Sequence, residues 1–182
     1  MLPQPQQLKE LSQALVRLNQ PVVWSLRTDY HIHLSEELMS LAQFDLEASV
    51  ATDKRLLVVS WVPQKMVLSH ESIGLFVSHC GWNSTVEALS EGKPIVCWSQ
   101  FGDQLVNAEL VERNKAGVII RDAHLSSGRV VLEDEILQMI EMAQTKGNGA
   151  LTVKEKLRLA WKTGGSSSSS FQSLTQLIDS YQ

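Results

Sequence analysis

The chain has 182 residues, 43% of them hydrophobic and 20% charged, with a formal net charge of −4 at pH 7. It is long enough for one globular domain with its own core, and its charge argues against nucleic-acid binding. No apolar run is long enough to span a membrane, and the first residues show no secretory signal pattern. Because the two cysteines, Cys80 and Cys97, lack disulfide or metal spacing, we expect a reduced, cytoplasmic protein.

Hydrophobic periodicity predicts helices that alternate with short strands. An amphipathic helix follows Pro3 and Pro5 at the start of the chain. Continuous aliphatic runs predict buried strands over 21–27, 55–61, 73–79, 94–98 and 116–120. Helical spacing predicts further helices over 36–42, 65–69, 84–91, 104–115, 133–145, 151–162 and 171–181. The alternation of the two kinds of element predicts an α/β domain with a parallel sheet.

Two stretches lack this periodicity. Residues 28–54 are polar and irregular apart from the short helix at 36–42. The Gly-Gly-Ser-Ser-Ser-Ser-Ser tract at 164–170 is predicted to be a flexible or turn-forming connector. We therefore divide the chain into one domain over 1–163 and a tail over 164–182, which holds the connector and the last helix.

Polar and aromatic side chains follow three of the predicted strands. Trp61 and Gln64 follow one strand, the segment 79–84 follows the next, and the segment 99–104 follows the third. In sheets of this kind, ligands bind beyond the carboxyl ends of the parallel strands. We therefore expect the three segments to form one cleft.

The segment 79–84 and the helix after it have two interpretations. Asn83 and Ser84 at a helix start would leave backbone N–H groups free for an anion, and His79 beside them would donate to a phosphate oxygen. Gly81 would let the backbone approach such a ligand closely. Alternatively, Ser84 and Glu87 form a capping box, which needs no ligand and is favoured on these residues alone. As a ligand group, Glu87 would accept hydrogen bonds from both hydroxyls of a ribose.

The other two segments also have two interpretations. Trp61 is either a core residue or a platform on which a flat base stacks, with Gln64 offering a donor and an acceptor to the edge of that base. Asp103 either caps the helix that begins at Gln104 or joins Gln104 in binding the hydroxyls of a sugar. The sequence has no G-x-G-x-x-G or Walker spacing, and the His-Ile-His at 31–33 has no carboxylate or thiolate partner. We therefore predict neither a dinucleotide site nor a metal site.

One continuous stretch carries a family resemblance. Residues 61–104 read WVPQKMVLSHESIGLFVSHCGWNSTVEALSEGKPIVCWSQFGDQ. Without insertion or deletion, they resemble the signature of plant family-1 UDP-sugar-dependent glycosyltransferases, which opens with Trp-x-Pro-Gln, contains His-Cys-Gly-Trp-Asn-Ser and closes with an acidic residue and Gln. The flanking VVWSLR and NAELVERNKAGVII and the late Gly-Gly-Ser-Ser also look familial, so the resemblance covers most of the chain. It implies that residues 1–163 are the UDP-sugar-binding, Rossmann-like C-terminal half of a GT-B glycosyltransferase.

The resemblance also implies a role for each matching residue. Trp61 would stack on uracil, Val62 and Gln64 would contact its edge and the nucleoside, and Glu87 would hold the ribose hydroxyls. The residues that would bind the diphosphate are His79, Asn83 and Ser84. The residues that would contact the sugar are Trp82, Asp103 and Gln104. Glutamine at that last position is typical of family members that use UDP-glucose, so we expect UDP-glucose as the donor, with no metal or other cofactor.

The sequence departs from the family pattern in three ways. Ser99 stands where the family usually has proline, which predicts a softer loop before Asp103. The family's catalytic base is a histidine in its other domain, so we expect no catalytic residue in this chain, which alone would not transfer glucose to its small lipophilic acceptor. The chain also begins at a helix where the family first has a central strand, so we expect unpaired backbone groups beside that slot. The alternative is a non-catalytic UDP-sugar-binding module or a truncated pseudo-enzyme.

Overall fold

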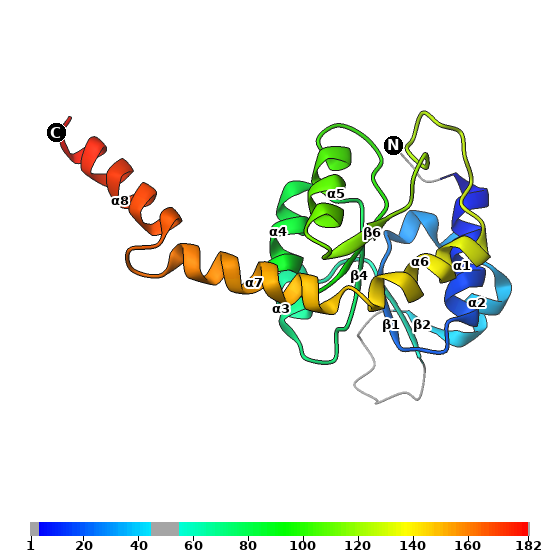
Figure 1. Cartoon of the computed structure of the whole chain (residues 1–182). Helices are drawn as coiled ribbons and strands as arrows, with labels where there is room; N and C mark the ends of the chain where they lie inside the picture. The colour runs from blue at the N-terminus through cyan, green and yellow to red at the C-terminus, as the bar shows by residue number, and fades with distance from the viewer. Residues whose placement is uncertain (1–3, 45–54, 182) are drawn as a thin grey trace.

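The computed structural model of the protein describes residues 4–44 and 55–181. Strands and helices alternate from β3 to β6, and three helices in succession close the chain (Figure 1). In chain order the elements are α1 (Pro5–Arg17), β1 (Val22–Ser25), η1 (Thr28–His33), α2 (Glu36–Leu41), β2 (Ala42–Phe44), β3 (Leu56–Val59), α3 (Gln64–Ser69), β4 (Phe76–Ser78), α4 (Trp82–Ser90), β5 (Ile95–Cys97), α5 (Gln104–Arg113), β6 (Gly117–Ile119), α6 (Glu133–Gln144), α7 (Gly147–Trp161) and α8 (Ser166–Asp179). None of these helices has the length and apolar character needed to cross a membrane.

The strands form two parallel sheets. The strand order is β1-β3-β2 in one sheet and β4-β5-β6 in the other, and every pairing is parallel. The predicted parallel α/β fold is therefore confirmed, but the strands are divided between two sheets where we expected one. The central strands β3 and β5 are built from the continuous aliphatic runs LLVV and IVC, and those runs are the most buried.

The division leaves a free edge on each sheet. Val22 and Leu26 donate their N–H groups toward β3, so the backbone of Val23 between them faces away from that sheet. On β4, the N–H of Phe76 donates to the carbonyl of Pro94, and the carbonyl of Ser78 accepts a hydrogen bond from the β5 side. The backbone groups of Val77, which lies between them, therefore point away from β5. Val23 and Val77 are 43% and 40% exposed, which agrees with the expected unpaired backbone groups. Within the described residues, no strand pairs with these two edges.

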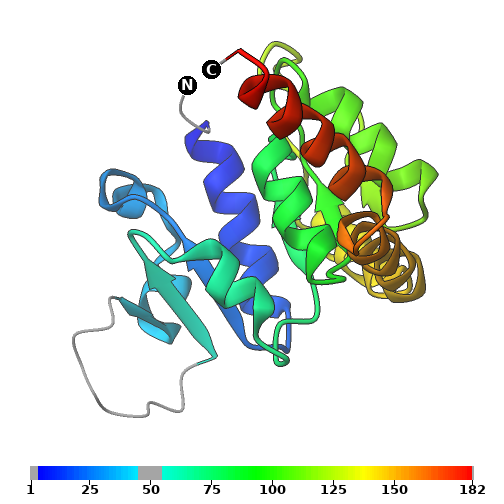
Figure 2. The same cartoon turned by 90° about the vertical axis from the view of Figure 1, so that its left-hand side faces the viewer.

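Helix α1 joins the two sheets. Leu11 on α1 and Leu18, the C-cap residue of α1, pack against the core beneath β5 and β6 and also against the core beneath β1 and β3. Figure 2 shows α1 between the two sheets. Pro5 stands in the first turn of this helix, where its missing N–H costs no helical hydrogen bond.

The structure differs from the predictions at several elements. The 3₁₀ helix η1 and the short strand β2 were not predicted, and residues 45–54 of the segment predicted to be irregular lie outside the described residues. Helix α7 begins at Gly147, earlier than the predicted start at residue 151. Gly149 allows its first turn to approach the backbone of Lys115, because a Cβ atom at position 149 would lie 2.0 Å from the carbonyl oxygen of Lys115. The Gly-Ser tract is a turn at Gly164 and Gly165, as one of the two alternatives predicted, but its five serines form the first turns of α8. In Figure 1, α7 and α8 extend away from the body of the molecule.

Candidate functional site

The carboxyl ends of β3 and β4 bring together three of the predicted site residues. Gln64, the first residue of α3, donates from Nε2 to Oε2 of Glu87 at 2.8 Å and to Oγ of Ser84 at 3.2 Å. Glu87 and Ser84 both lie on α4, so these hydrogen bonds tie α3 to α4. They also leave the second carboxylate oxygen of Glu87 and the side-chain oxygen of Gln64 without a partner among the described residues.

A cavity of about 570 Å³ lies beside this cluster. It is lined by Trp61, Pro63, Gln64, Lys65, Met66, Ser69, Glu87 and Glu91. Trp61 is 73% exposed, so the interpretation of this tryptophan as a core residue is wrong. Val62 is only half-buried, next to Trp61 in the loop between β3 and α3. Sequence reasoning did not identify Lys65 as a residue of this cavity. Its place just after a predicted strand end, beside Gln64, is a signal that could have indicated it.

The N-terminus of α4 is not closed by a capping box. The helix begins at Trp82 with Gly81 as its N-cap residue, and no side chain caps it. Ser84 is therefore inside the first turn, and Glu87 lies a further turn along and bonds to Gln64. The first helical N–H with a backbone acceptor belongs to Thr85, so the N–H groups of Trp82, Asn83 and Ser84 have no acceptor within the described backbone. The capping interpretation, favoured from the sequence, is wrong.

His79 lies against this helix start. A Cβ atom at position 81 would be 2.6 Å from Nε2 of His79, so only glycine leaves room for the ring where it is. Cys80, between them, has a positive φ of 64°, a conformation that side-chain-bearing residues rarely adopt. His79, Trp82 and Asn83 are exposed and therefore accessible beside the free N–H groups.

Asp103 and its neighbours form the third part of the site. Asp103 precedes α5 without capping it, and its Oδ2 accepts from Nδ2 of Asn107 at 3.0 Å. The same amide nitrogen donates to the carbonyl oxygen of Cys80 at 2.9 Å, so Asn107 connects the segment after β5 with the turn after β4. Sequence reasoning missed Asn107, although its spacing of four from Asp103 places both on one face of the helix.

The loop before Asp103 is held by internal hydrogen bonds. The hydroxyl of Ser99 donates to the carbonyl of Gln104 at 2.9 Å, and Oε1 of Gln104 accepts from the backbone N–H of Gln100 at 2.9 Å and of Phe101 at 3.2 Å. The hydroxyl of Ser99 thus makes a hydrogen bond that closes the loop, while the expected softening by Ser99 stays a prediction. Gln104 is 5% exposed, and its oxygen is occupied by the loop while its amide nitrogen has no partner among the described residues.

The two thiols lie in the core beneath the site. Cys80 and Cys97 are both fully buried, and Cys97 ends β5 beside the turn that carries Cys80. The contact with Cys80 and the burial of the thiol raise the pKa of Cys97. The Cys97 thiol is therefore a neutral core side chain, and Cys80 packs beside it in the core. The described residues contain no group of three or more histidine, cysteine or acidic side chains arranged to hold a metal ion.

Comparisons with known proteins agree with this arrangement. A family model described as "UDP-glucoronosyl and UDP-glucosyl transferase" matches residues 2–148. The chain is 35% identical over 178 residues to UDP glycosyltransferase 9 of Catharanthus roseus and 34% identical over 186 residues to anthocyanidin 3-O-glucosyltransferase 1 of Fragaria ananassa. These alignments cover 95% and 96% of this chain but 36% of each relative, so the chain spans about a third of their length.

A solved structure shows the same fold. The structure of a UDP-glucose:anthocyanidin 3-O-glucosyltransferase in complex with UDP superposes with a TM-score of 0.82 and 31% identity, over 99% of this chain and 38% of the other. The predicted Rossmann-like α/β fold of the GT-B type is thus confirmed. On the family match and these identities, the chain belongs to the UDP-glucoronosyl and UDP-glucosyl transferase family.

Proposed function

We propose that this chain is the donor-binding part of a UDP-dependent glycosyltransferase and that it binds UDP-glucose. The observation that carries the proposal is the Gln64–Glu87–Ser84 cluster, which lies beside the exposed Trp61 and the uncapped start of α4. The end at Trp61 suits a nucleoside, and the end at the start of α4 suits an anion. The complex of a similar glucosyltransferase with UDP supports the same ligand class.

The nucleoside would occupy the cavity of about 570 Å³. Uracil would stack on Trp61, and stacking of a base on an aromatic side chain contributes about 1–3 kcal/mol. The free oxygen of Gln64 would accept from the base or the nucleoside. Glu87 would accept from the ribose hydroxyls with the carboxylate oxygen that Gln64 leaves free.

The diphosphate would bind at the start of α4. Three unpaired backbone N–H groups and the positive end of a helix of nine residues favour an anion there. His79, Asn83 and Ser84 would add side-chain donors, and Gly81 keeps the His79 ring beside these N–H groups. This use of the helix start needs no metal ion and no other cofactor.

The sugar would lie toward Trp82, Asp103 and Gln104. Asp103 is exposed, and Asn107 holds its carboxylate in place, so its remaining oxygen is free to accept from sugar hydroxyls. Gln104 would contribute only its amide nitrogen, because its oxygen closes the loop. We assign no base to these residues: His79 is proposed as a phosphate ligand, and inverting transfer to a small lipophilic acceptor would need a base from elsewhere.

Calorimetric titration with UDP and with UDP-glucose tests the proposal. We expect saturable binding of both, and a loss of about tenfold or more in affinity for His79→Ala, because one hydrogen bond to a charged group is removed. His70→Ala is the matched control, since His70 is an exposed histidine outside the site. A folded chain that binds neither ligand, or equal affinities for the two variants, would contradict the proposal.

A further inference from the structure

Helix α8 carries an apolar stripe that faces solvent. The stripe is formed by Phe171, Leu174, Leu177 and Ile178 on the helix and by Tyr181 just after it, and each of these residues is more than half exposed. Their spacing of three and four residues places them on one side of the helix. No residue of α8 is buried within the part of the chain that the structure describes. We call these five residues the α8 stripe.

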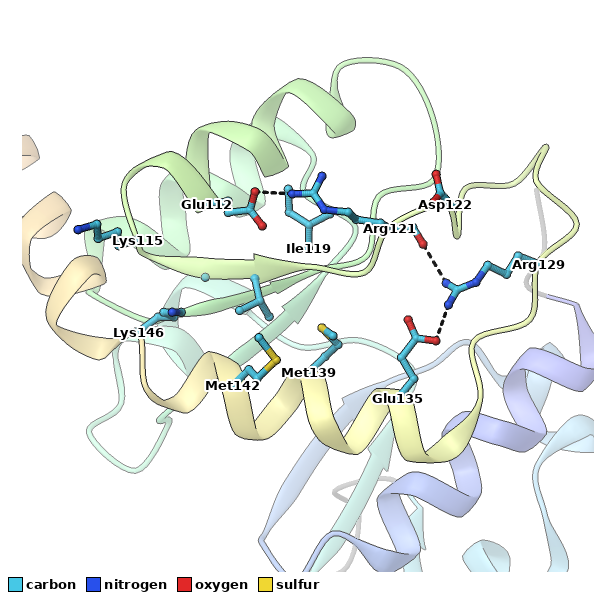
Figure 3. Close-up of a pocket in the computed structure, with 12 residues that line it drawn as sticks. Glu112, Lys115, Ile119, Arg121, Asp122, Arg129, Glu135, Met139, Met142 and Lys146 are labelled. Carbon is cyan, nitrogen blue, oxygen red and sulfur yellow. Dashed lines mark hydrogen bonds and ion pairs between the residues drawn. The ribbon is translucent and has the colours of Figure 1, made fainter.

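The α8 stripe differs from the groove of about 500 Å³ beside β6. In that groove, Arg121 pairs with Glu112 and Arg129 pairs with Glu135 (Figure 3). The charged side chains of the groove already satisfy one another. The α8 stripe, by contrast, leaves more than half of its surface in water.

The stripe is accessible to a second molecule. In Figure 1, α8 lies at the far end of the arm that α7 and α8 form, away from both sheets. The ring of Phe171, at the start of the stripe, contacts the ring of Trp161 on α7, and their centroids are 6.2 Å apart. The rest of the stripe continues along α8 beyond this contact.

The charge of α8 decides between kinds of partner. Residues 166–182 contain no lysine or arginine, and Asp179 is their single charged side chain. Helices that lie on membrane surfaces carry cations for the anionic headgroups, so α8 does not suit a lipid surface. Two identical helices of this composition, however, pair without rows of like charge that repel each other.

The stripe also has the spacing of a helix-pairing seam. Phe171, Leu174, Ile178 and Tyr181 occupy successive a and d positions of a heptad repeat. The e and g positions beside them hold serine, threonine and leucine, so no charge opposes pairing there. A second α8 therefore matches the stripe in both shape and charge.

The exposed area of the stripe suits a weak dimer. Large side chains bury about 150–250 Å² when they are fully covered, so the exposed parts of the stripe amount to roughly 500 Å² per copy. Two stripes in contact bury about 1,000 Å², which is the area at which specific interfaces begin. Because α8 is already helical in each copy, pairing orders few additional residues.

We propose that two copies of this chain pair through antiparallel α8 helices. Antiparallel pairing places the two bodies at opposite ends of the helix pair, whereas parallel pairing would bring both bodies to one end (Figure 1). In the antiparallel pair, Leu174 packs on Ile178 of the second copy, and the two-fold axis passes close to Thr175. The contact is the same on both copies and therefore closes at a dimer. This inference does not rest on the function proposed for the donor site.

Sedimentation equilibrium of the full chain between about 1 and 500 µM tests the proposal. We expect a dimer with a Kd of about 10–100 µM and at least about tenfold weaker association for Leu174→Gln, which changes both copies at the centre of the contact. Leu132→Gln is the matched control, because Leu132 is 61% exposed at the start of α6 and should not affect association. A chain that stays monomeric, or equal effects of the two variants, would overturn the proposal and leave the stripe to the polypeptide that the relatives have outside the matched third.

Cysteine crosslinking tests the orientation of the pair. Cys80 and Cys97 are fully buried, so an introduced cysteine is the accessible thiol. In the antiparallel pair, the two copies of Thr175→Cys lie about 3 Å apart along the helices, and those of Ser168→Cys lie about 24 Å apart. Copper-catalysed air oxidation should therefore give a covalent dimer with Thr175→Cys alone, and equal crosslinking of the two variants would contradict antiparallel pairing.

Discussion

Replacing Asn107 with alanine should destabilise the turn that carries His79. Asn107 is 7% exposed, and its amide nitrogen donates to the carbonyl of Cys80 at 2.9 Å and to Asp103 at 3.0 Å. Asn107→Ala leaves that carbonyl without its donor in the interior, which costs about 1–3 kcal/mol. Since Asp103 is exposed, water replaces the second hydrogen bond at little cost. We therefore expect the free energy of unfolding to fall by about 2 kcal/mol in total.

Urea unfolding of Asn107→Ala and a matched variant measures this effect. Asn114→Ala removes a side-chain hydrogen bond from the same residue type on the same helix, where Asn114 donates to the carbonyl of Leu110 at 2.9 Å in an exposed position. That variant should change the free energy of unfolding by less than about 0.5 kcal/mol. If the two variants lose equal stability, Asn107 does not hold the turn. Affinity for UDP should fall with Asn107→Ala if the turn positions the diphosphate site.

Two further predictions concern the same turn. Gly81→Ala places a Cβ atom 2.6 Å from the His79 ring, so it should displace the ring and weaken UDP binding. Gly74→Ala is the control, because its Cβ atom would have no heavy atom within 4 Å and UDP affinity should not change. Calorimetric titration with UDP compares the two variants. The raised pKa of Cys97 keeps its thiol protonated at pH values where an ordinary cysteine ionises, so raising the pH from 7 to about 9 should not accelerate its reaction with a thiol reagent in the folded chain. In urea the reaction should be fast at the same pH, and rapid labelling of Cys80 or Cys97 without urea would refute their burial.

The long regular elements were predictable from the sequence, because their signals are local. The short, β-branched aliphatic runs that form β3 and β5 are typical of buried strands, and α1 is amphipathic. By contrast, β2 is three residues long and exists through its pairing with β3, which is a tertiary contact. The serine tract became helical for a related reason. It precedes an amphipathic run, and the rings of Trp161 on α7 and Phe171 on α8 are in contact at 6.2 Å.

The candidate site was only partly predictable. The clustering of Gln64 with Glu87 follows from the rule that the carboxyl ends of parallel strands meet, which the sequence reveals once strands are assigned. The capping interpretation of Ser84 depended on where α4 begins, and it fails because the helix begins two residues earlier, at Trp82. The spacing of four from Asp103 indicates one partner of Asn107, but its bond to the carbonyl of Cys80, far away in the sequence, has no signal in the side-chain pattern.

The position of α1 determines how cooperatively the molecule unfolds. Each three-stranded sheet has its own core, and Leu11 and Leu18 are the α1 side chains that take part in both. Melting of either sheet would expose these leucines and so weaken the other core, whereas a detached α1 would leave two small units that are each marginal in size. Helix α1 and the hydrogen bonds between α3 and α4 thus couple the two sheets, and the free energy with which α1 docks should decide whether one transition or two is observed.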